Sequence, residues 1–351
     1  MISFMTKSKK NIHWINSVRA IAIIAVFFVH TQLYYGCIAD GINSFVFPWY
    51  VNAFFFISGY LLFWKQLSEP KILEDKKHYI SHNGGGRILF LNVLYRIVIT
   101  SIIFSAIEFF PSCIIQGRGI DIGFALYKTI GGGTYWFTSA LVVAELILLL
   151  LFWTRKRNIW FYATLCVVLG LAGLVIVNLD ILHNGIWAWR QGLIALIFLS
   201  MGGLYWKYEK KIDKQLMHWW FVAPLLIAYI LMVIGLKEYN DPLISTLSIQ
   251  PLGFVTSAMA CLLLVWLCKK LPEIKPLSFI GSNSLGFYFL SGALPITFGM
   301  IANKLLVSGS TLMMLAFWVA CVIIAYVAVL VINRWLPWLW DLRKAKSFNL
   351  L

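Results

Sequence analysis

Two ionisable residues, Arg19 and His30, stand out because they lie inside a long apolar stretch, residues 14–35. A neutral imidazole can take a proton from a hydroxyl group, or it can attack an activated acyl group itself. A guanidinium binds phosphates and carboxylates with its planar fork of donors. His30 is therefore a candidate base or nucleophile, and Arg19 is a candidate binding group for an anion.

Residues 14–35 predict a helix that is long enough to cross a bilayer. Over the eleven residues from Arg19 to His30, a helix turns three times plus roughly 20° and rises about 16 Å, so both side chains lie on one face. An ionisable residue inside a membrane span is costly and marks a functional site by default. Two structural alternatives stay open: His30 bonded between helices, and Arg19 snorkelling to the inner headgroups.

The composition predicts an all-α integral membrane protein with a single transmembrane domain over residues 1–351. Of the 351 residues, 61% are hydrophobic and 12% are charged, whereas a soluble domain has about 25% charged residues. Hydropathy predicts a bundle of ten transmembrane helices. Their ranges are 14–35, 48–65, 88–110, 135–153, 159–177, 187–206, 219–236, 249–268, 283–303 and 311–333.

The basic residues predict the orientation of these helices. With the N-terminus inside, 22 of the 29 Lys and Arg residues fall on inner segments and five on outer segments. Such an excess of positive charge marks the cytoplasmic side, so both termini are expected in the cytoplasm. The net charge of +15 is accounted for by this pattern, and nucleic acid is not an expected partner.

Three further charged residues inside the predicted spans are candidate site residues. Arg96 in the third span and Glu145 in the fourth lie at similar depths, so an ion pair between them, structural or catalytic, is an open expectation. Glu108, near the outer end of the third span, is a candidate to orient His30, although a carboxylate at this boundary is more often solvated.

The second span carries two polar candidates. Asn52 enters the membrane at about the depth of His30 and is expected to bond either His30 or a substrate. Ser58 precedes a glycine, and we interpret this pair as a packing point between helices rather than as a nucleophile.

No zinc-like spacing of histidines or cysteines occurs, so no metal site is predicted. Cys37 and Cys113 are both expected on the outer side, which leaves a disulfide open.

Four segments resemble the acyltransferase-3 family of integral membrane O-acyltransferases. Arg19 and His30 in RAIAIIAVFFVH fit that family's Arg-x10-His signature. The other three segments are FFFISGYLLF (54–63), YWFTSALV (135–142, containing Trp136) and FIGSNSLGFYFL (279–290). They occur in the family's order along nearly the whole chain. The Trp-Phe version of the third segment is closer to members that acetylate or succinylate fucose or exopolysaccharide.

The resemblance implies a multi-pass enzyme of a bacterial inner membrane, surrounded by lipids. Such enzymes transfer acetyl or succinyl from cytoplasmic acyl-CoA to a hydroxyl of a surface polysaccharide or lipid-linked sugar. They hold no permanent cofactor, and oligomerisation stays open. His30 and Arg19 match the family's essential histidine and arginine. The family's Arg-x-x-Arg motif has Val93 at its first position here and Arg96 at its second, with Arg87 upstream as a substitute.

Two other functions remain open from the sequence. A polysaccharide or acyl-group transporter would move its substrate without covalent change, although the chain shows no internal repeat of the kind common in transporters. An assembly protein would use its buried polar residues only for packing. In that case His30→Ala would destabilise the protein without selectively removing an activity.

The predicted orientation can be tested with single cysteines placed at positions 120 and 210. We expect a membrane-impermeant thiol reagent added to intact cells to label position 120, which lies in an outer segment, and to leave position 210 unlabelled until the membrane is opened. Labelling of position 210 from outside would contradict the orientation.

Overall fold

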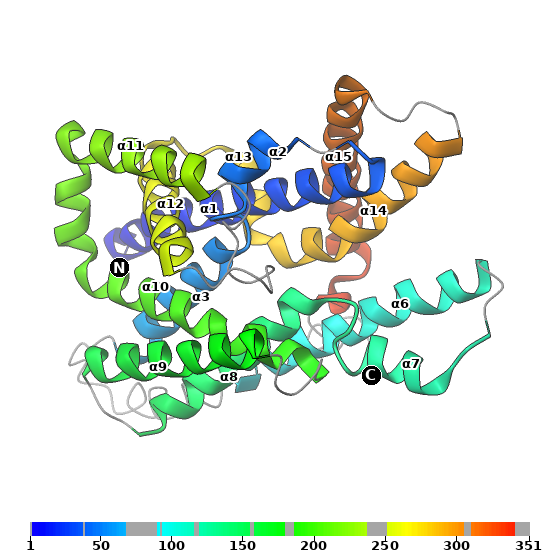
Figure 1. Cartoon of the computed structure of the whole chain (residues 1–351), viewed down its shortest axis with the longest axis horizontal. Coiled ribbons are helices and arrows are strands. Elements are labelled where there is room, and N and C mark those ends of the chain that lie inside the picture. The colour runs from blue at the N-terminus through cyan, green and yellow to red at the C-terminus, as the bar shows by residue number, and fades with distance from the viewer. Residues whose placement is uncertain are drawn as a thin grey trace. The chain divides into compact units, whose positions relative to one another are not determined.

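The structure, a computed structural model, describes residues 2–37, 39–67, 90–91, 93–115, 119–154, 158–179, 186–236, 251–304 and 310–340. These residues form helices joined by turns, and they contain no strand (Figure 1). The chain divides into two compact units, and two of the three boundaries between them fall inside helices, namely α3 and α10, while the third follows residue 336. Each unit is described by itself.

The first unit contains residues 1–54 and 211–336. It includes the first turn of α3 and the last turns of α10. Its complete helices are α1 (Ile2–Tyr35), α2 (Asp40–Val46), α11 (Trp219–Leu236), α12 (Pro251–Lys270), α13 (Lys275–Ser282), α14 (Ser284–Lys304) and α15 (Thr311–Trp335).

The second unit contains residues 55–210 and 337–351. It holds most of α3 (Asn52–Leu67) and of α10 (Trp189–Leu216). Its other elements are η1 (Leu94–Val98), α6 (Ile99–Ile115), α7 (Ile122–Thr129), α8 (Trp136–Phe152), α9 (Ile159–Asn178), η2 (Ile186–Ala188) and η3 (Pro337–Leu339). Of these, η1 is a single π-helical turn that runs directly into α6.

The all-helical class predicted from hydropathy is confirmed for the described residues, and each of the ten predicted ranges overlaps a described helix. Among the described residues, six helices are long and apolar enough to cross a bilayer on their own. A seventh span results if α10 and α11 are counted as one broken span. The chain is therefore a multi-pass membrane protein, while the count of ten spans and the orientation of the termini stay predictions.

Helix α1 forms the centre of the first unit, where it packs against α12, α13, α14 and α15 (Figure 1). Backbones approach closely at two glycines, because a Cβ built on Gly281 would overlap Asn16 and one on Gly299 would overlap Tyr34. Residue numbers rise together on both sides of these contacts, so α1 runs parallel to α13 and α14. From α15, Trp318 donates its indole N–H to the carbonyl of Ile24 at 3.1 Å.

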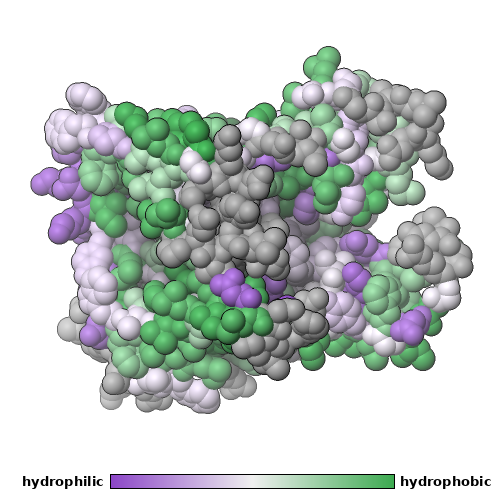
Figure 2. All heavy atoms as spheres, in the orientation of Figure 1, coloured by the Kyte–Doolittle hydropathy of each residue, from purple (hydrophilic) through white to green (hydrophobic). Residues whose placement is uncertain are grey.

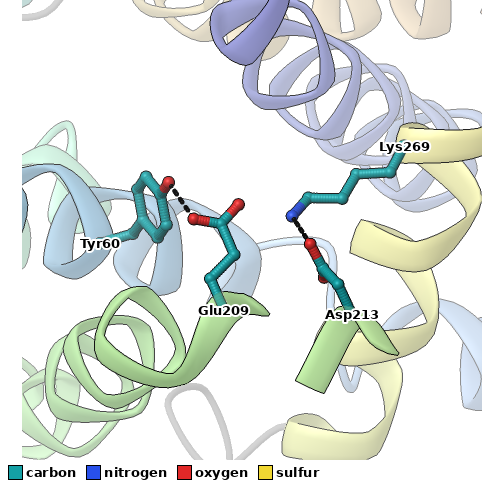
Figure 3. A network of polar contacts seen from close by, with 4 residues as sticks. All are labelled: Tyr60, Glu209, Asp213 and Lys269. Atoms are coloured by element: carbon teal, nitrogen blue, oxygen red, sulfur yellow. Dashed lines mark hydrogen bonds and ion pairs between the residues drawn. The ribbon is translucent and has the colours of Figure 1, made fainter. Parts of the chain in front are cut away.

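Small residues set the packing of α3 against α10 in the second unit. A side chain on Gly59 would overlap the backbone of Leu199, and one on Gly202 would overlap that of Phe56. Small residues of this kind let membrane helices approach closely. Beyond this crossing, the hydroxyl of Tyr60 donates to Glu209 Oε2 at 2.8 Å (Figure 3).

Large apolar side chains remain exposed on many helices, and Figure 2 shows them over much of the visible face. On α9, Val168 and Val175 are each 54% exposed, and on α15 Val327 is 53% exposed. A soluble monomer rarely exposes such extended apolar surface. These faces fit the hydrocarbon of a lipid bilayer, in which a helix satisfies its backbone polar groups internally.

The close contact of α1 with α13 makes a prediction about stability. Gly281→Ala adds a methyl group where the backbone of Asn16 leaves no space, and overpacking of this kind costs about 1–3 kcal/mol. We expect a lower Tm in detergent, measured by the loss of monodisperse protein on heating. Gly292→Ala is the matched control, since no atom lies within 4 Å of its added methyl; an equal loss of Tm in both variants would contradict this packing.

Candidate functional site

His30 makes one well-defined polar contact across the first unit. Its ring nitrogen Nδ1 lies 2.8 Å from the backbone carbonyl oxygen of Ser291 in α14. A carbonyl oxygen can only accept, so Nδ1 carries the proton and donates it. In the neutral ring the lone pair then belongs to Nε2, which is the nitrogen available to take a proton or to attack a carbonyl carbon. The rings of His30 and Tyr34 make a T-shaped contact, with centroids 6.4 Å apart.

Arg19 lies on α1 eleven residues before His30 and is partly buried. Near the same end of α1, the ammonium group of Lys269 lies 4.8 Å from the ring centroid of Trp14. Lys269 also forms an ion pair with Asp213 Oδ2 at 2.7 Å (Figure 3). Lys269 therefore contacts this end of α1 through the ring of Trp14 while it is paired with the carboxylate of Asp213.

Asn52 is fully buried at the start of α3. Its amide group donates to the carbonyl of Pro48 at 3.1 Å and to the hydroxyl of Ser257 at 3.2 Å. Its Oδ1 has no hydrogen-bond partner among the described residues. The sequence suggested either His30 or a substrate as its partner; the structure assigns its donor group to Ser257, which the sequence did not single out.

Arg96 and Glu145, both in the second unit, differ in their surroundings. Arg96 lies in the π-helical turn η1 and is exposed, whereas Glu145 in α8 is 8% exposed. Within the described residues no ion pair joins the two, so the pairing that their similar depths allowed is not formed. A π-helical turn inside a helix is rare and is often found at functional sites, and no feature of the sequence signalled it.

Glu108 has a partner that sequence reasoning missed. The hydroxyl of Tyr135 donates to Glu108 Oε2 at 2.8 Å. Tyr135 directly precedes α8, and its backbone carbonyl accepts hydrogen bonds from the side chains of Thr138 and Ser139. Glu108 therefore ties α6 to the start of α8 and helps to position the residues around Trp136.

A cavity of about 190 Å³ lies beside Trp136 in the second unit. The residues that line it are Tyr127, Gly131, Gly132, Gly133, Trp136, Ala188, Trp189, Arg190 and Gln191. Arg190 is only 8% exposed. The wall is fixed by unusual backbone: Gly132, Trp187 and Ala188 all have positive φ, and Trp187 donates its N–H to the carbonyl of Gly131 at 2.8 Å. Non-glycine residues in this conformation are strained and cluster at functional sites.

The predicted site residues divide between the two units. Arg19, His30 and Asn52 belong to the first unit, and Ser58, Arg96, Glu108, Trp136 and Glu145 belong to the second. Ser58 precedes Gly59, whose contact with α10 supports the packing interpretation. Arg87 lies outside the described residues. Cys37 and Cys113 both carry free thiols.

Comparison with known proteins gives one match. A family model described as an acyltransferase domain matches residues 12–334, which include every predicted site residue. None of the curated proteins and none of the solved structures matches the chain.

Proposed function

Since the chain belongs to the acyltransferase-3 family, we propose that it transfers an acetyl or succinyl group from cytoplasmic acyl-CoA to a hydroxyl group of a surface polysaccharide or a lipid-linked sugar. The proposed location is the inner membrane of a bacterium. The observation that carries this proposal is the hydrogen bond from Nδ1 of His30 to the carbonyl of Ser291. It leaves Nε2 as a base or nucleophile inside a membrane helix.

In the direct route, Nε2 of His30 takes the proton of the acceptor hydroxyl while its oxygen attacks the thioester carbonyl carbon. The carbon–sulfur bond then breaks, and the leaving thiolate of CoA receives the proton from Nε2. In the second route, Nε2 attacks the thioester carbonyl carbon and the carbon–sulfur bond breaks, which releases CoA as its thiolate. The acceptor hydroxyl then attacks the acyl-imidazolium carbon, its proton passes to the thiolate, and the carbon–nitrogen bond breaks to restore Nε2. Both routes require Nε2 to hold the lone pair, as the contact with Ser291 provides.

Arg19 is proposed to attract the phosphates or the pantetheine arm of acyl-CoA. It lies about three turns before His30 on the same helix face, and the predicted orientation puts it at the cytoplasmic end. A pantetheine arm is long enough to pass from there to His30. Arg96 and Arg87 are proposed to support donor binding, and the exposure of Arg96 is consistent with this role.

The cavity beside Trp136 is the proposed contact for the sugar acceptor. Its lining combines aromatic rings, glycine backbone and a guanidinium, and mixed apolar and polar walls of this kind suit a polar ligand with apolar faces. Its residues fall in or next to segments predicted on the outer side, where a surface glycan is found. Glu108 supports this region through Tyr135, and Asn52, Ser58 and Glu145 are assigned supporting roles.

His30→Ala is expected to lower acyl transfer by about 10²–10⁴-fold, the usual contribution of a general base, while the protein stays folded. Mass spectrometry of surface glycans from cells with either protein would measure the acyl content, and the Tm of the purified proteins would report folding. His218→Ala, in which the lost ring stacks on Trp220, is the matched control. Normal glycan acylation in the His30 variant would refute the assignment, and transport without covalent change would indicate a transporter.

Arg19→Ala is expected to raise the apparent KM for acyl-CoA by roughly tenfold to a hundredfold, the size of a lost charge-assisted hydrogen bond. Initial rates in membrane vesicles, with acetyl-CoA or succinyl-CoA varied at fixed acceptor, would measure this. Arg334→Ala, which removes an exposed arginine near the end of α15, should leave the KM unchanged. Donor affinity equal to that of the unmodified protein would count against the role of Arg19.

A further inference from the structure

The acceptor for His30 is a carbonyl in the interior of a helix, where carbonyls are normally occupied. In an α-helix the carbonyl of each residue accepts the N–H of the residue four positions later. Ser291 lies within α14, and the residue four positions later is Pro295, which is also inside this helix. Proline has no backbone N–H. The carbonyl of Ser291 therefore lacks its helical donor.

We propose that Pro295 is a positioning residue for His30. By withholding an amide from the carbonyl of Ser291, it keeps this oxygen as the acceptor for Nδ1–H and so holds the lone pair of the ring on Nε2. The inference rests on the proposed function for its catalytic consequence, but the hydrogen bond and the proline stand independently of it.

The surroundings favour this assignment. Ser291 is 1% exposed, so water does not readily satisfy its carbonyl, and an unsatisfied buried carbonyl is costly. The hydroxyl of Ser291 donates to the carbonyl of Tyr288 at 2.7 Å, so its proton is not directed at the imidazole of His30. Further along α14, the close contact of Gly299 with the backbone of Tyr34 fixes the register of the two helices.

Two other prolines lie inside described helices and serve as internal comparisons. Pro111 in α6 leaves the carbonyl of Ile107 without its helical donor, and Pro224 in α11 does the same for Trp220. Ile107 is 53% exposed and Trp220 is 59% exposed. Neither carbonyl accepts a hydrogen bond from a side chain among the described residues. Of these three helix-interior prolines in the described part of the chain, Pro295 alone pairs a freed carbonyl with a titratable ring.

Pro295→Ala restores the missing amide, which then competes with His30 for the carbonyl of Ser291. We expect kcat to fall by about threefold to tenfold, the size expected for one neutral hydrogen bond, with the KM for acetyl-CoA or succinyl-CoA unchanged. We also expect ¹⁵N NMR of histidine-labelled protein to show His30 shifting from the Nδ1–H form to a mixture of both tautomers. The signal of His30 is identified by its loss in His30→Ala.

Pro224→Ala is the matched control, and it should change neither kcat nor the histidine signals. Pro295→Gly restores the same amide with a more flexible backbone. It is expected to show the same fall in kcat and the same mixture of tautomers, and it replaces the alanine variant should that variant fail to fold. Unchanged kcat and unchanged tautomer signals in a folded Pro295 variant would overturn the inference. The NMR readout needs no turnover, so it stays valid even if His30→Ala retains full acylation and the proposed function fails.

Discussion

The structure depends on one constraint, which is that polar groups inside a membrane protein must find partners within the protein. Helix α1 brings an imidazole into an apolar environment, and α14 supplies a carbonyl to receive its proton. The contact at Gly299 lets the backbones of α1 and α14 approach closely, and the contact at Gly281 does the same for α1 and α13. Packing and chemistry in the first unit are therefore parts of the same arrangement, since a helix shifted along α14 would leave the ring of His30 without its acceptor.

Much of the fold could be predicted from the sequence, because apolar runs of about 20 residues directly encode membrane helices. The spacing of Arg19 and His30 on one helix was also accessible, since it needs only helix geometry. The acceptor for His30 was not accessible, because Ser291 is 261 positions away and the register of two distant helices decides which carbonyl is reached. A signal did exist, since a proline in a predicted span marks the carbonyl four residues earlier as unoccupied.

In the second unit, charge and predicted depth do not identify the partners of the buried and boundary side chains. The sequence predicts Arg96 and Glu145 at matching depths, but depth does not specify the direction in which a side chain points around a helix. Glu108 bonds Tyr135, a residue that the sequence indicated only as part of a family-like segment. The cavity beside Trp136 could not be predicted either, because its wall includes a glycine turn and the strained backbone at Ala188, and neither has a reliable signature in a single sequence.

The large separation between His30 and Ser291 also affects how the protein is made. At a synthesis rate of about 5–20 residues per second, the 261 residues that follow His30 up to and including Ser291 take roughly 13–52 s to appear. During this interval α1 has entered the membrane, but the partner of its imidazole does not yet exist. Water, lipid headgroups or the insertion machinery must satisfy the ring in the meantime. The first helix to be synthesised is thus among the last to reach its final state, and its chemistry is assembled only when α14 arrives.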